Sequence, residues 1–311
     1  MCALFGVIDY GRSLSTKQKT KIITALAQTC EARGKDATGI AYNSGGRLNI
    51  YKRPLAARKM RFRLPGNAYT VMGHTRMATQ GDERINANNH PFRGITVDSE
   101  FALAHNGVIC NDRELRQTHN LPTPQIETDS YIAVQLIEQA GWFNFASIAA
   151  MAEKLYGTFT FTLLDNTDNL YVVKGNNPLC LYHWPKSKLY LYASTEALLT
   201  EALSKLPNFT EKPQKIYLDQ GDILRIDPQG SRNVEYFDTA NLTRAVTYSR
   251  PVGIYNRFYI DELKSISHAF GYTPEDIDEL IHEGITSEEI EDYFYGGDYL
   301  WTGAYSPSPS R

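Results

Sequence analysis

Short apolar runs separated by turn-forming residues dominate the first three quarters of this chain, and their spacing predicts strands and helices in an irregular order. Apolar or alternating runs predict strands at 4–9, 38–43, 48–52, 70–76, 101–105, 158–165, 170–174, 179–183, 189–193, 216–218 and 222–227. Helical spacing behind capping residues predicts helices that begin near positions 15, 130, 144 and 195 and end near 33, 140, 155 and 206. Because strands and helices do not alternate regularly, this order favours antiparallel sheets stacked on each other with helices outside, an α+β fold.

The character of the sequence changes beyond about Phe237, which predicts a main domain over 2–240 and a short acidic helical extension over 250–311. The extension has capped helix signals at 273–276 and 286–289, an aromatic cluster at 293–301 and a Ser- and Pro-rich tail at 305–311. The tail composition predicts disorder. The aromatic cluster either packs back on the main domain or docks a partner protein, and both interpretations remain open.

Composition narrows the class of protein. The 311 residues carry a net charge of −3, which argues against binding nucleic acid through bulk electrostatics. No apolar run approaches the roughly 20 residues that cross a bilayer, and no signal peptide is recognisable. Four cysteines lie far apart without CxxC spacing: Cys2, Cys30, Cys110 and Cys180. We therefore expect a cytoplasmic protein with no membrane association, no bound metal and no cofactor; an oligomer remains possible.

Cys2 is the first candidate for chemistry, because it directly follows the initiator methionine. If Met1 is removed, Cys2 carries a thiol and a free α-amine on one residue. An α-amine has a reference pKa of about 7.7–8.0, near the operating pH, and a thiol attacks best as the thiolate. The alternative is that Cys2 is only a small apolar residue at the start of a strand.

Three further positions carry unusual residues at the ends of predicted elements: Arg76, Asn106-Gly107 and Asp129. Each has a plainer interpretation, namely a surface ion pair, a hairpin turn and a helix cap. Together with Cys2, however, they match an α-amino acid that has a side-chain amide. Arginine binds a carboxylate bidentately, aspartate takes an ammonium, and an asparagine amide beside a backbone N–H can hold an oxyanion.

Six stretches of the sequence occur in the order typical of one enzyme family. They are MCALFG (1–6), RGKDATG (33–39), GHTRMAT (73–79), NHPF (89–92), HNGVI (105–109) and ETDS (127–130). The chain thereby resembles the class II (N-terminal-nucleophile) glutamine amidotransferases over residues 2 to about 237. It is similar to the glutaminase domains of glucosamine-6-phosphate synthase, glutamine phosphoribosylpyrophosphate amidotransferase and asparagine synthetase.

The resemblance implies a four-layer αββα sandwich of two antiparallel sheets, the N-terminal-nucleophile hydrolase fold, and a role for each matched residue. Cys2 would attack the glutamine amide after loss of Met1, and its α-amine would shuttle the proton. The implied catalytic residues are Cys2, Asn106 and Gly107, with Arg33 and Gly34 in a loop that closes over Cys2. The implied substrate-binding residues are Arg76 for the carboxylate, Asp129 for the ammonium, and Thr79, Met77 and His90 in the pocket.

Two departures from the family concern coupling to an acceptor. Met77 and Gln80 stand where the sugar-synthase members carry Trp and His. In the family, glutamine hydrolysis does not need those side chains. The departures therefore put in doubt how hydrolysis is coupled to the acceptor enzyme, and they leave the expected glutaminase activity unchanged.

The expected function is a stand-alone glutaminase subunit that passes ammonia to a separate synthase protein. The chain has no phosphate-binding P-loop, no SGGxD motif and only about 70 residues after the expected sandwich. Two alternatives stay open: an N-terminal-nucleophile hydrolase of another amide, and a non-catalytic interaction protein that keeps the fold.

Overall fold

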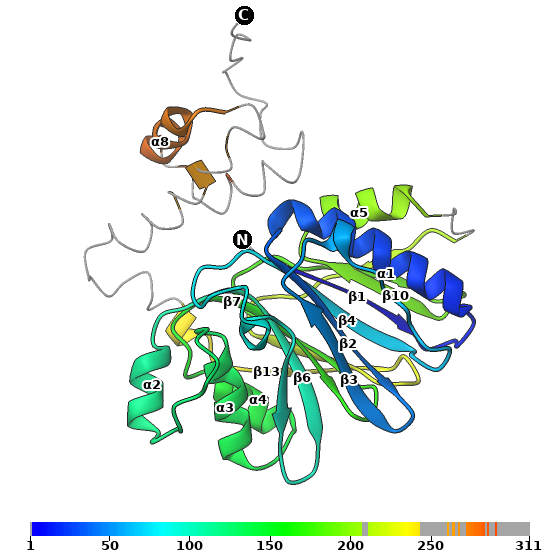
Figure 1. Ribbon diagram of the computed structural model, residues 1–311, viewed down its shortest axis with the longest axis horizontal. Helices are drawn as coiled ribbons and strands as arrows, with labels where there is room; N and C mark the ends of the chain where they lie inside the picture. The colour runs from blue at the N-terminus through cyan, green and yellow to red at the C-terminus, as the bar shows by residue number, and fades with distance from the viewer. Residues whose placement is uncertain are drawn as a thin grey trace, which may run out of the picture. The chain divides into compact units, whose positions relative to one another are not determined.

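The computed structural model describes residues 2–206, 211–242 and 272–283, together with residues 260, 263, 264, 267, 285 and 290. The chain divides into two compact units, Met1–Tyr248 and Ser249–Arg311. The first unit contains both sheets and the candidate site (Figure 1). In the second unit, α8 (Pro274–His282) follows an N-cap at Thr273 that forms a capping box with Asp276. The helix signal at 286–289, the aromatic cluster and the tail lie outside the described residues.

Two antiparallel sheets form the framework of the first unit, as far as its residues are described. One sheet has the order β11 (Gln214–Ile216), β9 (Cys180–Trp184), β10 (Leu189–Ala193), β1 (Ala3–Asp9), β4 (Thr70–Arg76), β2 (Ala37–Ser44) and β3 (Arg47–Arg53). The other has the order β13 (Arg232–Tyr236), β12 (Asp222–Ile226), β8 (Leu170–Lys174), β7 (Gly157–Asp165), β6 (Glu100–Ile109) and β5 (Phe92–Ile95). β1 therefore lies in the middle of its sheet, between β10 and β4.

Helices cover the outer face of each sheet. α1 (Thr16–Cys30) and α5 (Glu196–Ser204) share a buried apolar core with β1, whereas α3 (Tyr131–Ala140) and α4 (Phe145–Ala152) share one with β6 and β7. A third apolar core lies between the sheets. The remaining short helices are η1 (Glu31–Arg33), η2 (Ala57–Lys59), η3 (Asn86–Asn88) and α2 (Asp112–Thr118). The predicted αββα sandwich is confirmed.

Alternation of side chains along two strands directs the candidate residues to the inside of the sandwich. In β1, Leu4 and Ile8 lie in the core between the sheets, and Phe5 packs under the helices. In β6, Ala104 lies in the core between the sheets and Leu103 faces α3. Successive strand residues point to opposite faces, so residues two apart share a face. The side chain of Cys2 therefore points the same way as Leu4, and that of Asn106 the same way as Ala104, toward the space between the sheets.

Several predicted boundaries are wrong in informative ways. β6 does not end at His105 but continues through Asn106-Gly107 to Ile109, so this pair is not a hairpin turn. β11 covers 214–216 and not 216–218. β5, β13 and α2 had no counterpart among the predicted elements. In the described part of the chain no helix is long and apolar enough to cross a membrane.

Candidate active site

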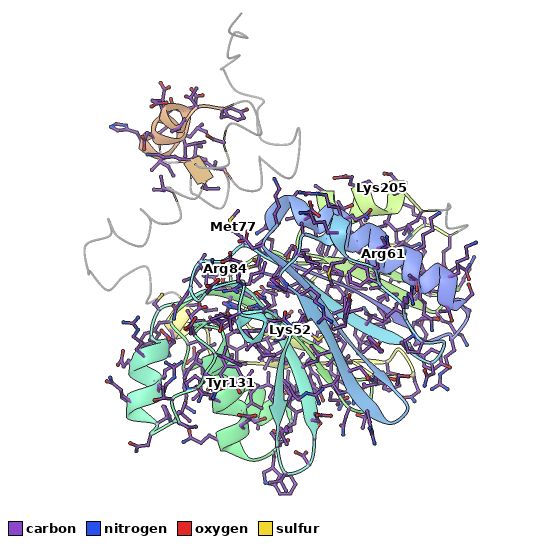
Figure 2. The ribbon with its side chains drawn as sticks, in the orientation of Figure 1. Lys52, Arg61, Met77, Arg84, Tyr131 and Lys205 are labelled. Carbon is purple, nitrogen blue, oxygen red and sulfur yellow. The ribbon has the colours of Figure 1, made fainter. Side chains whose placement is uncertain are left out.

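A pocket opens at the end of the sandwich where β1 begins and β4 ends. It encloses about 250 Å³ of free space, counting the part open to solvent. The residues that line it are Cys2, Arg76, Met77, Thr79, Gln80, His90, His105, Gly107, Thr128, Asp129 and Ser130. Figure 2 shows Met77 at this end of the sheet, just after β4.

The pocket brings together seven of the ten predicted site residues, which come from segments as far apart as positions 2 and 129. The other three, Arg33, Gly34 and Asn106, do not line the pocket. Sequence reasoning gave no role to His105, Thr128 or Ser130. Each lies in a stretch that matches the family, HNGVI (105–109) or ETDS (127–130), next to a residue that was selected, and that position was the available signal.

Cys2 is held in place through its backbone as well as its side chain. Its Sγ lies 3.5 Å from the carbonyl oxygen of Met77, and its own carbonyl oxygen accepts a hydrogen bond from Arg33 Nε at 3.0 Å. Arg33 is buried, with 1% of its surface exposed. A Cβ on Gly34 would lie 2.5 Å from the carbonyl carbon of Arg76, so only glycine allows this loop to pass so close to the end of β4. Arg33 thus holds the backbone of Cys2, and Gly34 lets the loop that carries Arg33 pass close to the end of β4.

The amide of Asn106 is buried without a hydrogen-bond partner for Nδ2 among the described residues. Buried polar groups are almost always paired, and an unpaired donor suggests a ligand or a catalytic role. Next to it, Gly107 has a φ of +139°, and a Cβ there would lie 2.1 Å from the carbonyl oxygen of Thr158. The close approach of β6 and β7 therefore requires glycine here, and the Gly107 backbone lines the pocket.

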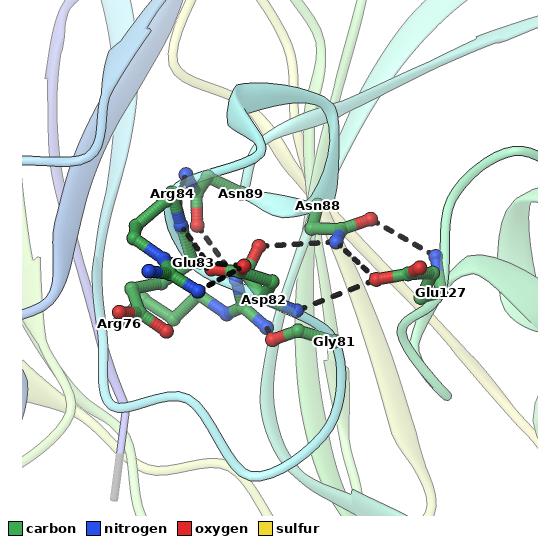
Figure 3. A network of polar contacts seen from close by, with 8 residues as sticks. All are labelled: Arg76, Gly81, Asp82, Glu83, Arg84, Asn88, Asn89 and Glu127. Atoms are coloured by element: carbon green, nitrogen blue, oxygen red, sulfur yellow. Dashed lines mark hydrogen bonds and ion pairs between the residues drawn. The ribbon is translucent and has the colours of Figure 1, made fainter.

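The guanidinium of Arg76 is fixed by the loop that follows β4 (Figure 3). Nη1 donates to Asn89 Oδ1 at 2.7 Å, and Nη2 donates to the carbonyl oxygens of Gln80 at 2.6 Å and Gly81 at 3.0 Å. Burial lowers the pKa of Arg76, but an arginine stays protonated at neutral pH. The pocket therefore has a fixed positive charge on one wall.

The carboxylate of Asp129 supplies the opposite charge. Its Oδ2 accepts from the backbone N–H of Ile109 in β6 at 2.6 Å, and its Oδ1 accepts from Ser130 Oγ at 3.3 Å. Burial raises the pKa of Asp129 to about 6, against the opposing effect of these hydrogen bonds. At pH 7 this carboxyl group is mostly ionised.

Three buried histidines lie together beside the pocket, and two of them, His90 and His105, line it. The rings of His74 and His90 are 4.2 Å apart, and His105 Nδ1 lies 2.8 Å from Ser130 Oγ. Burial lowers the pKa of His74 and of His105 to about 3, and lowers the pKa of His90 well below its usual value. All three rings are therefore neutral at pH 7. The described residues contain no group of three or more acidic, histidine or cysteine side chains placed to hold a metal ion.

Comparison with known families and sequences agrees with this geometry. Residues 74–201 match the model of the glutamine amidotransferase domain. Glutamine–fructose-6-phosphate aminotransferases (isomerizing) are similar over 58% of this chain: 32% identical in Halalkalibacterium halodurans, 29% in Streptococcus pyogenes and 31% in Staphylococcus aureus. The matched part covers 30% of each relative, so the chain corresponds to under a third of their length.

Two solved structures share the fold. Glutamine phosphoribosylpyrophosphate amidotransferase from B. subtilis, complexed with ADP and GMP, has a TM-score of 0.61 and is 21% identical. The match covers 85% of this chain and 57% of that one. A structure described as the allosteric regulatory enzyme of purine biosynthesis has a TM-score of 0.60 and is 19% identical. That match covers 99% of this chain and 68% of the other. The sandwich therefore carries a glutamine amidotransferase domain: residues 74–201 match that family, and the fold is the one seen in glutamine phosphoribosylpyrophosphate amidotransferase.

Proposed function

We propose that this domain hydrolyses the side-chain amide of L-glutamine, with Cys2 as nucleophile, to give glutamate and ammonia. One observation carries the proposal: Cys2, the fixed guanidinium of Arg76 and the buried carboxylate of Asp129 all line a single pocket. A free α-amino acid has a carboxylate and an ammonium on one carbon, which fit Arg76 and Asp129. Its side chain then extends toward Cys2.

The chemistry would take two steps. In the first, the Cys2 sulfur bonds to the amide carbon, and the oxygen becomes an oxyanion that Asn106 Nδ2 and the Gly107 N–H stabilise. The C–N bond then breaks and ammonia leaves with the thiol proton, which the Cys2 α-amine has carried across. In the second step water attacks the thioester, glutamate is released and the thiol regains its proton. Removal of Met1 is part of the proposal, because it frees this amine.

Delivery of the ammonia to a separate synthase protein is proposed with the hydrolysis. Its support is that the relatives are named glutamine–fructose-6-phosphate aminotransferases, a name that joins glutamine to an acceptor for its amino group. Co-purification of a second protein that raises amide-nitrogen transfer over simple glutamate release would support this part.

Glutamate release from L-glutamine tests the hydrolysis, with L-asparagine and simple acyl amides as competing substrates. We expect turnover of glutamine only, in material whose intact mass lacks Met1. Cys2→Ala should abolish turnover without changing the melting temperature. Cys2→Ser should keep only a trace of activity, because a hydroxyl is rarely ionised at neutral pH. Full turnover with Met1 retained would refute the proton shuttle, and preference for another amide would refute the substrate.

A further inference from the structure

Asn88 joins the loop that follows β4 to the segment that contains Glu127 (Figure 3). Its Nδ2 donates to Glu127 Oε2 at 2.9 Å and to the carbonyl oxygen of Asp82 at 3.0 Å. Its Oδ1 accepts from the backbone N–H of Glu127 at 2.9 Å. The side chain is buried with 0% exposure. Both ends of one amide are thus used to hold position 127 against the loop after β4.

Asn89, the next residue, points to the other end of the pocket. Its Oδ1 accepts from Arg76 Nη1 at 2.7 Å, and its Nδ2 donates to the carbonyl oxygen of Glu83 at 2.7 Å. Asn89 is also fully buried. Two consecutive asparagines therefore hold the two charged ends of the pocket, one directly through Arg76 and the other through Glu127, two residues before Asp129.

Further contacts make this connection stiff. Gln80 Nε2 donates to the carbonyl oxygen of Glu127 at 3.0 Å, while the Gln80 carbonyl oxygen accepts from Arg76. The Asp82 N–H lies 3.4 Å from Glu127 Oε2. A displacement of residues 127–129 would therefore break several hydrogen bonds that lead back to Arg76.

We propose that Asn88 and Asn89 are positioning residues that set the spacing between the Arg76 guanidinium and the Asp129 carboxylate. This inference rests on the proposed function. An α-amino acid presents its two charges on one carbon, so both contacts form together only when that spacing is correct. A misplacement of about 1 Å can cost a hundredfold in rate. The asparagine pair thereby favours a substrate that has both charges over one that has only the carboxylate.

Asn88→Ala tests the inference through substrate preference. For the wild type we expect L-glutamine to be used far better than glutaramic acid, which lacks only the ammonium. In Asn88→Ala we expect KM for L-glutamine to rise about tenfold or more, kcat to change less than about threefold, and the preference over glutaramic acid to shrink. The matched control is Asn86→Ala, in the same turn, where Nδ2 donates to the Lys52 carbonyl oxygen instead. That control should keep the wild-type preference.

A second variant keeps the test decisive if Asn88→Ala does not fold. Glu127→Ala keeps the hydrogen bond from the backbone N–H of residue 127 to Asn88 Oδ1. It should therefore raise KM for L-glutamine less than Asn88→Ala does, and it should also shrink the preference for L-glutamine over glutaramic acid. If the wild type hydrolyses L-glutamine but folded Asn88→Ala, or Glu127→Ala, keeps the wild-type preference for L-glutamine over glutaramic acid, the inference is overturned and the proposed function is not. A wild type that neither hydrolyses nor binds L-glutamine overturns the proposed function and this inference together.

Discussion

At the scale of single residues, Asp129 combines burial with a need for charge. Burial raises its pKa to about 6, and only the ionised form attracts an ammonium group. Below that pH the free pocket increasingly carries a neutral carboxyl group. If the domain binds L-glutamine as proposed, the pKa of this one side chain sets the acid limit of substrate binding.

We predict that affinity for L-glutamine falls on acidification. In Cys2→Ala, which removes the chemical step, Kd should be about tenfold higher at pH 5 than at pH 7.5, because one pH unit below a pKa leaves about a tenth of the group ionised. Calorimetric titration at both values measures it. Asp129→Asn should bind weakly at both pH values, and a Kd of Cys2→Ala that does not change with pH would contradict the role assigned to Asp129.

Arg76 and Asn106 should separate binding from chemistry. Arg76→Lys keeps a charge but loses the planar fork, so KM for glutamine should rise with a modest change in kcat. Asn106→Ala removes a donor needed mainly in the transition state, so kcat should fall about 10²–10³-fold with little change in KM. Steady-state glutamate release measures both. An equal loss of both parameters in the two variants would refute this division of roles.

At the scale of elements, the close pairing of β6 with β7 depends on Gly107. We predict that Gly107→Ala destabilises the domain by about 3 kcal/mol or more, because it combines backbone strain with overlap against the Thr158 carbonyl. Gly45→Ala is the matched control. Its φ is also positive, at +61°, but no atom lies within 4 Å of the added Cβ, so it should cost about 1 kcal/mol.

Denaturant unfolding of both variants measures the difference. Equal losses would mean that backbone conformation alone matters at Gly107 and that contact with β7 does not.

The elements that carry the site were predictable because their signals are local. The sequence predicts β4 at 70–76 and a helix that begins behind Ser15, and the structure has both, with Ser15 as N-cap. The conformation of Asn106-Gly107 was harder to predict, because the same dipeptide is typical of hairpin turns. Here Gly107 has a positive φ within a continuing strand, and that conformation depends on β7, some 50 residues away.

The elements that sequence reasoning missed have little apolar periodicity. All five residues of β13 are exposed, so burial does not require an alternation of apolar and polar residues from which a strand could be predicted. β5 has only four residues and includes Gly94, and α2 buries just two of its seven residues, Asp112 and Leu115. The partners of Arg76 were equally hidden, because Gln80, Gly81 and Asn89 meet it only through loop geometry.

At the scale of the whole molecule, we predict that acid destabilises the sandwich. Each of the three buried histidines, His74, His90 and His105, has a folded pKa below its unfolded value, so its contribution to stability is complete above about pH 6.5 and declines as the pH falls. Asp129 acts in the opposite sense, because its folded pKa is raised. Between about pH 6 and 4 the three histidines therefore carry about three more protons in the unfolded chain than in the folded chain, whereas Asp129 carries about one more in the folded chain.

The net difference of about two bound protons at these four groups contributes about 2–3 kcal/mol of unfolding free energy per pH unit. Urea unfolding at pH 7, 6 and 5 measures this slope. A free energy of unfolding that stays constant across the series would show that the buried rings do not govern acid stability.

Asn106 Nδ2 has no hydrogen-bond partner among the described residues, so the same atom that the proposed mechanism uses for turnover lowers the stability of the folded state. A buried donor that has no partner among the described residues costs the folded state about 1–3 kcal/mol, and in the proposed mechanism an oxyanion supplies the missing partner. Selection for heat resistance alone would favour an apolar side chain at this position, whereas selection for activity would preserve the asparagine. In descendants of this domain that have lost catalysis, position 106 should therefore be among the first to drift, while Gly107, required by the packing of the sheet, should persist.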